Sequence, residues 1–218
     1  MKYIVINADI INSKNTQFKK ENIEENIKLL NSDLANDILV GFSILRGDEI
    51  QGIVDSHSDV FKVIRHLISA TKPFNVRIGV GIGDIYNIPK NAKSSWELNG
   101  EAFFKAREAI ESFSKSGQPD VVFVSENKKL DERINLFYSF VTNILNGWSL
   151  NTFKIIKLAE SGFTHEEIAE KIYSIEEHNH SIKNKRANVT QQIIRSQWYR
   201  IKDTEDALNE MLREGENK

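Results

Sequence analysis

The segment SILRGDEIQG, residues 43–52, places two adjacent carboxylates in a short turn between two apolar runs. Residues 38–45 and 50–54 are rich in isoleucine, leucine and valine, and branched residues of this kind favour β-structure. A Gly-Asp pair between two such runs is typical of a tight β-hairpin. The sequence therefore predicts a hairpin with Asp48 and Glu49 at its tip.

An alternation of predicted strands and helices surrounds this hairpin. Residues 3–11 are almost continuously apolar, which is typical of a buried central strand. Within residues 74–84 glycines alternate with apolar residues. Such small residues leave room above a sheet for a ligand or a closely packed helix. Further strands are predicted at 38–45, 50–54 and 119–126, and helices at 17–36, 60–72 and 99–113.

The order of these elements is β-α-β-β-α-β-α-β, which is a split βαβ pattern. It predicts a ferredoxin-like α+β domain over residues 1–140. We expect an antiparallel sheet with the first strand at its centre and with helices packed on one side. In this arrangement Asp9, near the end of the first strand, lies beside the hairpin that carries Asp48 and Glu49.

These three carboxylates are candidate metal ligands. Mg²⁺ prefers oxygen ligands and usually completes its coordination shell with phosphate oxygens. Asp9, Asp48 and Glu49 therefore indicate a site for Mg²⁺ and a nucleotide at one edge of the sheet. Two alternatives stay open. Asp48 and Glu49 are also common turn residues, and Arg46 in the same turn can pair with Asp48 and leave no cation site.

Four segments, taken in order, carry a resemblance to a known family: NADIINS at 7–13, GDEIQG at 47–52, VRIGVGIGDI at 76–85 and NGEAFFKAREAI at 99–110. Together they resemble the SatD family. More distantly, they are similar to class III nucleotidyl cyclases and to the palm domains of GGDEF diguanylate cyclases. The resemblance to these enzymes implies a metal-binding aspartate at Asp9 and a second acidic group in the hairpin turn.

The same resemblance implies basic residues that bind a nucleotide. Cyclases carry an Arg-x-Gly-x-x-x-Gly strand, which Arg77 and the glycines after it match. Class III cyclases also carry a catalytic Asn and Arg on the next helix. Phe104 and Glu108 stand at those positions here, with Arg107 one residue away. Catalytic turnover is therefore left open and no catalytic residue is assigned. The candidate nucleotide-binding residues are Arg46, Arg77 and Arg107.

Residues 145–218 are predicted to form a separate all-α helix-turn-helix domain. Two helices are indicated at 151–161 and 164–172, and Thr164 with Glu167 forms a capping-box sequence. Such a pair is typical of a helix-turn-helix. A long third helix, opened by a second capping box at Asn188 and Gln191, is predicted to follow. The polar insert between them is interpreted as a wing or loop.

The third helix is the candidate DNA-reading element. Residues 181–202 contain basic side chains and no acidic one, and positive charge attracts the phosphate backbone of DNA. We expect Ile194, Trp198 and Ile201 to face the core, with Ile193 at the margin, so that the opposite face is free for base edges. The candidate contacts are Gln192, Arg195, Ser196 and Tyr199 on the helix and Lys183, Lys185 and Arg186 in the wing. The alternative is a three-helix module that binds protein or dimerises.

The composition excludes several classes of function. The 218 residues include no cysteine, so disulfides, thiolate zinc sites and cysteine nucleophiles are excluded. No signal peptide or membrane-spanning stretch is recognisable, so a cytoplasmic protein without a membrane partner is expected. The leading hypothesis is a DNA-binding regulatory protein with a domain that binds a nucleotide and Mg²⁺. The alternatives are a nucleotidyl cyclase or oligonucleotide-forming nucleotidyltransferase that uses NTPs, and a protein-interaction scaffold. Analogy with cyclases also suggests a homodimer.

Overall fold

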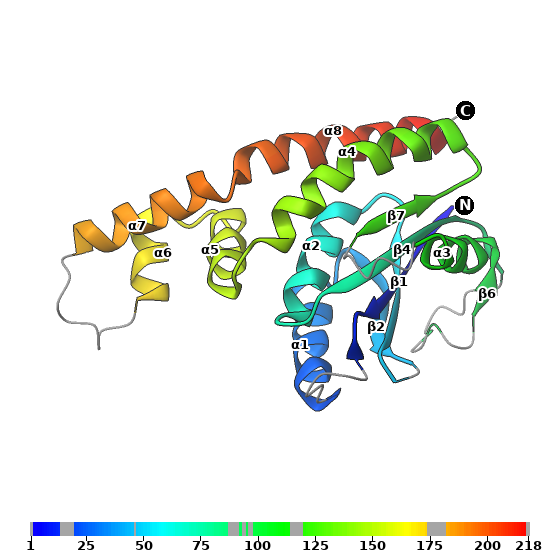
Figure 1. Cartoon of the computed structure of the whole chain (residues 1–218), viewed down its shortest axis with the longest axis horizontal. Helices are drawn as coiled ribbons and strands as arrows, with labels where there is room; N and C mark the ends of the chain where they lie inside the picture. Colours follow the sequence, from blue (N-terminus) through cyan, green and yellow to red (C-terminus); the bar gives the residue numbers. More distant parts are fainter. Residues whose placement is uncertain are drawn as a thin grey trace. The chain divides into compact units, whose positions relative to one another are not determined.

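The computed structural model divides the chain into two compact units (Figure 1). The first unit comprises Met1–Asn143 with Glu205–Lys218, and the second comprises Ile144–Thr204. The second unit begins near residue 145, where the sequence places a boundary, but the last residues of the chain group with the first unit. The structure describes residues 2–13, 20–45, 47–86, 92, 95, 98–113, 120–173 and 182–216.

A five-stranded sheet forms the centre of the first unit, in the order β2-β3-β1-β4-β7. Its strands are β1 (Tyr3–Ile10), β2 (Ile38–Ile44), β3 (Glu49–Asp55), β4 (Val76–Gly83) and β7 (Val121–Val124). The first strand is central, and it pairs antiparallel with both β3 and β4, as the split βαβ pattern predicts. The last strand pairs parallel with β4, so the sheet is mixed: one parallel pair is added to the antiparallel pairing that the sequence predicts.

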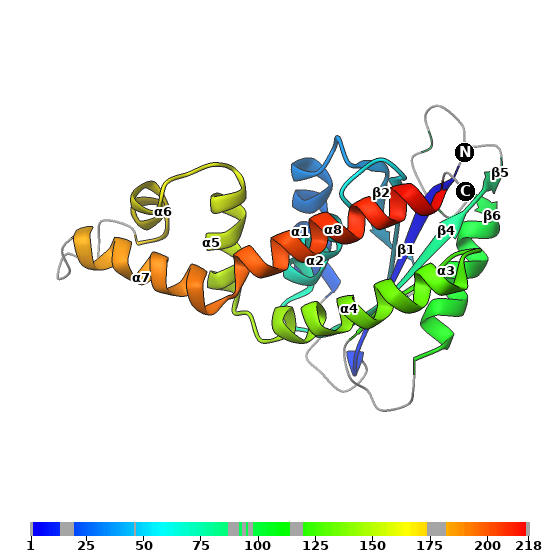
Figure 2. The ribbon, with the colours of Figure 1, turned by 90° about the horizontal axis from the view of Figure 1, so that it is seen from above.

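Helices cover both sides of this sheet, not the single side expected from the sequence (Figures 1 and 2). On one side, Phe61 of α2 (Val60–Thr71) and Tyr138 of α4 (Lys128–Asn146) pack around Phe123 of β7, with ring centroids 5.3 and 5.9 Å from it. On the other side, α3 (Glu101–Glu111) lies against Gly79 and Gly81 of β4. The fold of the first unit is α+β, with α1 (Lys20–Asp33) packed on α2 and β2.

Two local signals explain the helices α1 and α2. The apolar residues that recur at helical spacing in α1 and directly after it are all buried: Ile23, Ile27, Leu30 and Leu34. The carboxylate of Asp59 accepts a hydrogen bond from the backbone N–H of Lys62 and caps α2, as predicted. A short second sheet is formed by β5 (Ile85–Tyr86) and β6 (Asn99–Gly100), which lie between β4 and α3 in the sequence.

The structure also contains a helix that the sequence analysis does not predict, α4 at Lys128–Asn146.

The second unit is built around three helices that pack on one another: α5 (Leu150–Glu160), α6 (His165–Ile172) and α7 (Ile182–Arg195). The capping box at Thr164 and Glu167 is formed, as predicted. The long third helix is interrupted, because Gln197 adopts a left-handed backbone conformation with φ of 57°. A new helix, α8 (Trp198–Glu216), begins directly after this break. In the described part of the chain no helix is long and apolar enough to cross a membrane.

Candidate functional site

A polar stripe crosses the side of the sheet that α3 covers. Antiparallel register pairs Asn7 with Gln51, and it pairs Asp9 with both Glu49 and Arg77. Directly paired residues of neighbouring strands project to the same side of a sheet. These polar side chains therefore share the side on which Gly79 meets α3. On this side of the sheet, the residues toward the end of β1 that carries Asp9 are therefore polar.

Asp9 and Arg77 form an ion pair within this stripe. The guanidinium Nη2 of Arg77 lies 2.8 Å from Oδ2 of Asp9, and both side chains are largely shielded from solvent. Burial, and next the negative charge of Asp48, raise the pKa of the Asp9 carboxyl, although Arg77 acts in the opposite direction. Arg77 therefore holds the Asp9 carboxylate beside a second carboxylate that repels it.

The three predicted metal ligands meet at one hollow of about 250 Å³. Asp48 and Glu49 reach it from the hairpin, Asp9 from β1 and Arg107 from α3. The remaining lining residues are Asn7, Ala8, Ile110 and Glu111. The hydroxyl of Ser13 donates a hydrogen bond to Oδ2 of Asp48. Of the charged side chains around this hollow, the sequence analysis named Asp9, Asp48, Glu49 and Arg107 and missed Glu111.

The carboxylates alone do not make a complete metal site. Among the described residues, no group of three or more His, Asp or Glu side chains has the arrangement needed to hold a metal ion. Asp9 is also already paired with Arg77. Mg²⁺ is commonly held by one or two carboxylates together with waters and substrate phosphates. The oxygens of Asp48 and Glu49 fit that mode. The predicted role of Arg46 lies outside the described residues.

A second hollow of about 230 Å³ adjoins the first. The two share Asn7, Glu49 and Arg107 in their linings. The other residues around the second hollow are uncharged: Leu45, Gln51, Ser95, Leu98, Asn99, Phe103 and Phe104. The side chain of Gln51 donates through Nε2 to Oδ1 of Asn7 at 2.8 Å, and both residues are buried. Sequence reasoning missed Asn7 and Gln51, because single amides within apolar strands give no recognisable signal.

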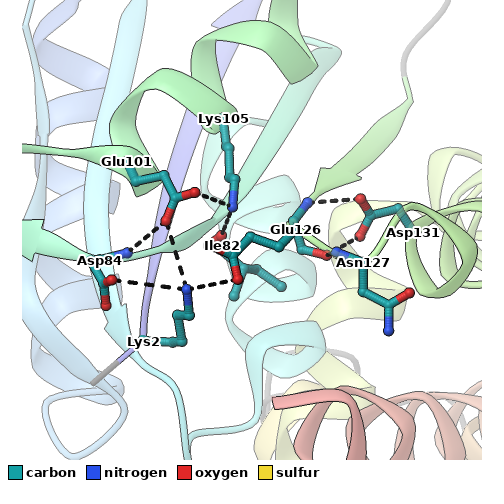
Figure 3. Close-up of polar contacts among 9 residues, drawn as sticks. Lys2, Ile82, Asp84, Glu101, Lys105, Glu126, Asn127 and Asp131 are labelled. Carbon is teal, nitrogen blue, oxygen red and sulfur yellow. Dashed lines mark hydrogen bonds and ion pairs between the residues drawn. The ribbon is translucent and has the colours of Figure 1, made fainter. Parts of the chain in front are cut away.

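The position of α3 determines the shape of both hollows, and polar contacts hold its first turns (Figure 3). The ammonium group of Lys105 lies 2.8 Å from Oε1 of Glu101 and donates to the carbonyl of Ile82 at 3.1 Å. This hydrogen bond from Lys105 lowers the pKa of the Glu101 carboxyl. Lys2 lies 3.7 Å from Glu101 and 3.1 Å from Glu126. Arg107 is thus presented by a helix that is anchored at its start.

The second unit places the predicted DNA-reading residues differently from the expectation. Ser196 is buried, and its hydroxyl donates to the carbonyl of Ile193 at 2.7 Å. Gln192 is half-buried and donates to the hydroxyl of Tyr173 at 3.0 Å. Arg195 and Tyr199 are exposed but lie on different helices. The prediction that these four side chains form one exposed face is therefore wrong, because the break at Gln197 changes the helical phase.

The start of α7 also differs from the prediction. Residues 182–187 are helical, so Lys185 and Arg186 belong to the first turns of α7 and not to a wing, and Asn188 lies inside the helix instead of capping it. The side chain of Lys183 lies outside the described set. Ile193 is buried while Ile194 is 57% exposed, the reverse of the expected order. The exposed polar stripe of α7 consists of Asn184, Asn188, Gln191 and Arg195.

Comparison with known proteins gives one family and one weak structural likeness. The model of the SatD family matches residues 3–197. The non-canonical dimeric guanylyl cyclase domain of the RhoGC fusion protein, from the aquatic fungus Blastocladiella emersonii, is 16% identical in sequence. The alignment covers 56% of this chain and 78% of that one, with a TM-score of 0.36. No curated protein matches the chain significantly.

Proposed function

The chain belongs to the SatD family, and for this member we propose a regulatory function with two parts. The first unit binds a nucleotide together with Mg²⁺, and the second unit binds DNA. The observation that carries the proposal is the hollow at which Asp9, Asp48, Glu49 and Arg107 meet. A Mg²⁺–nucleotide complex carries both signs of charge, and this hollow offers both signs.

Each side chain has a distinct part in the proposed binding. The carboxylates of Asp48 and Glu49 hold the cation, which supplies positive charge to the phosphates. The exposed guanidinium of Arg107 binds a phosphate group, for which its planar array of donors is suited. Arg77 orients Asp9 and does not contact the ligand, because its partner at 2.8 Å is the Asp9 carboxylate. This differs from the nucleotide-binding role that the sequence suggested for Arg77.

The exposed surface of α7 supports the DNA-binding part. Asn184, Asn188, Gln191 and Arg195 recur at intervals of three or four residues and are all exposed, which places them along one side of a helix. Amide and guanidinium groups are the side chains that read base edges in the major groove. Residues 182–202 include basic side chains and no acidic one, and such a local charge favours a polyanionic partner.

Binding, and not turnover, is the proposed role of the first unit. Class III cyclases resemble this chain in sequence, but Phe104 and Glu108 stand where they carry a catalytic Asn and Arg. The Phe104 side chain is 64% exposed and has no group that could orient a ribose or stabilise a triphosphate. Arg107 remains as the basic residue of α3 at the hollow. An enzyme that forms cyclic nucleotides or oligonucleotides is therefore the alternative.

Calorimetric titration with ATP, GTP, CTP and UTP, each with Mg²⁺, tests the first part. We expect at least one nucleotide to bind, and we expect Arg107→Ala to weaken it about tenfold through loss of a charged hydrogen bond. Arg133→Ala, an exposed arginine on α4, is the matched control. Absence of binding to all four nucleotides, with Mg²⁺ and with Mn²⁺, contradicts the proposal. Release of pyrophosphate would favour the enzymatic alternative.

A mobility-shift experiment with genomic DNA fragments tests the second part. We expect a complex whose affinity falls steeply between about 50 and 200 mM salt, because binding releases counterions from the phosphate backbone. Failure to shift any fragment at the lower salt concentration would rule out the DNA-binding role. The nucleotide-binding role is independent of this outcome and is tested by the calorimetric titration alone.

A further inference from the structure

The second hollow differs in chemistry from the carboxylate-lined hollow that it adjoins. Leu45, Leu98, Phe103 and Phe104 provide apolar walls. Its charged lining residues, Glu49 and Arg107, are those that it shares with the first hollow. Charged side chains commonly hold phosphate groups and free cations. An uncharged, partly aromatic lining instead suits a flat, apolar group that carries polar atoms on its edge.

Two amide groups stand at the floor of this hollow. Asn7 and Gln51 are 5% and 8% exposed, and Nε2 of Gln51 donates to Oδ1 of Asn7. Each amide carries one further group, the donor Nδ2 of Asn7 and the acceptor Oε1 of Gln51. The hydrogen bond between the two amides uses neither of these two groups. The floor therefore presents one donor and one acceptor side by side.

A buried hydroxyl gives independent support for a ligand. Ser95 lines the same hollow and is 1% exposed. Among the described residues, its Oγ has no hydrogen-bond partner. A buried hydroxyl without a partner costs free energy, so such groups usually serve a ligand, an ion or an ordered water. Ser95 adds a third hydrogen-bonding position to the two amides.

We propose that the second hollow receives the base of the nucleotide, with Asn7, Gln51 and Ser95 reading its edge. The inference rests on the proposed nucleotide-binding function and names the part of the site that selects the ligand. Each nucleobase has flat apolar faces and an edge on which a donor and an acceptor are adjacent. Glu49 and Arg107, which belong to both hollows, lie where the base-bearing end of the ligand gives way to its phosphates.

The substitution Asn7→Asp provides a sharp test because it changes one atom. The aspartate keeps the acceptor for Nε2 of Gln51, but its second oxygen accepts where Nδ2 of Asn7 donates. The floor then presents two acceptors. Guanine is the base that offers two adjacent donors, on N1 and on the exocyclic N2, so the variant is expected to shift its preference toward GTP. Asn143→Asp, the same change at an exposed position of α4, is the control.

The experiment is calorimetric titration of the full chain with ATP, GTP, CTP and UTP, and with inorganic tripolyphosphate, each with Mg²⁺. We expect at least one nucleotide to bind about tenfold or more tightly than tripolyphosphate, as one well-made hydrogen bond would give. The ratio of GTP affinity to that of the other nucleotides should rise in Asn7→Asp and stay constant in Asn143→Asp. Ser95→Ala should weaken the binding of nucleotides about tenfold and leave the affinity for tripolyphosphate unchanged.

The possible failures separate this inference from the function on which it rests. If all four nucleotides bind no better than tripolyphosphate, and neither variant changes the ratios, the base site is disproved while a phosphate and cation site remains. If nothing binds, the proposed function and the base site fail together. If Asn7→Asp does not fold, as judged by circular dichroism, the Ser95→Ala result decides. The hydroxyl of Ser95 holds no described residue in place.

Discussion

Arg65 on α2 and Glu205 on α8 form an ion pair in which each side chain is only 3% exposed. On the same helix, Asn209 donates to Oδ1 of Asp59 at 2.8 Å, and Arg213 donates to the carbonyl of His57 at 3.2 Å. These polar contacts join the end of the chain to the helix α2 and to the residues that precede it. They explain why Glu205–Lys218 belongs to the first unit although it follows the second in sequence.

Loss of Glu205 is expected to be strongly destabilising. Glu205→Ala leaves the Arg65 guanidinium buried without its counter-charge, and changes of this kind cost about 3–5 kcal/mol. Urea denaturation, monitored by circular dichroism, measures the free energy of unfolding of each variant. Glu214→Ala, at an exposed position of α8, should change it by less than about 0.5 kcal/mol. A cost for Glu205→Ala as small as that of the control would show that the buried pair is not formed.

The ionisation of Asp9 predicts how stability depends on pH. Burial and the nearby Asp48 raise the pKa of Asp9 above its ordinary value of 3.8. In the folded chain the charged form is therefore disfavoured, and this penalty is present above the folded pKa and disappears as pH falls toward 3.8. The unfolding free energy of the unmodified chain should thus rise relative to that of Asp9→Asn on acidification from pH 7.

Denaturation curves at several pH values between about 7 and 4 measure this difference, since that window spans the fall toward the unfolded value. Asp203→Asn, an exposed aspartate on α8, is the control substitution. If the difference between the unmodified chain and Asp9→Asn stays constant or moves the other way, Asp9 is not held in the electrostatic environment described above.

The break between α7 and α8 predicts a stabilising substitution. Gln197 has a φ of 57°, a left-handed conformation that is unfavourable for a residue with a side chain. Gln197→Gly relieves this strain, and after the entropy cost of glycine we expect a gain of about 0.5–1 kcal/mol. Gln191→Gly, inside α7, should instead cost about 1 kcal/mol. In thermal and urea unfolding, the free energy of unfolding should therefore increase in Gln197→Gly and decrease in Gln191→Gly.

The exposed stripe of α7 predicts which substitutions alter DNA binding. Arg195→Ala should weaken binding, with the salt slope reduced by about one unit if the guanidinium contacts a phosphate. Gln191→Ala should change the preference among DNA sequences, because amides read base edges. Ser196→Ala should leave binding unchanged, since Ser196 is buried. Mobility shifts at two salt concentrations check all three, and equal behaviour of Arg195→Ala and Ser196→Ala would refute the proposed surface.

The strands of the main sheet and the helices α1, α2 and α3 could be predicted because their apolar periodicity is clear, whereas α4 was not predicted. Ile23, Ile27 and Leu30 of α1, and Leu34 directly after the helix, are all buried at the expected spacing. The position of α3 could not be predicted from such periodicity. The glycines of β4 are compatible with either a ligand or a helix above the sheet, and only the three-dimensional packing shows that the helix α3 occupies this side.

Part of the candidate site could also be predicted, since acidic residues in a turn and at a strand end are visible in the sequence. The neutral part could not. Asn7 and Gln51 become important only through their register across β1 and β3, which brings the two amides together. Likewise, a single left-handed residue at Gln197 reverses the roles of Ile193 and Ile194, and no local pattern announces it.

The two glycines of β4 beneath α3 have a consequence for how the sequence of this protein can change during evolution. Gly79 and Gly81 touch α3 with no side chain between them, so a single added methyl group at either position would act as a wedge under the helix. Because Arg107 lines both hollows and Phe104 lines the second, a displacement of α3 would change the shape of both hollows together. For the proposed nucleotide site, the size of the ligand that fits could therefore change through two positions that lie beneath the helix and outside the linings of both hollows.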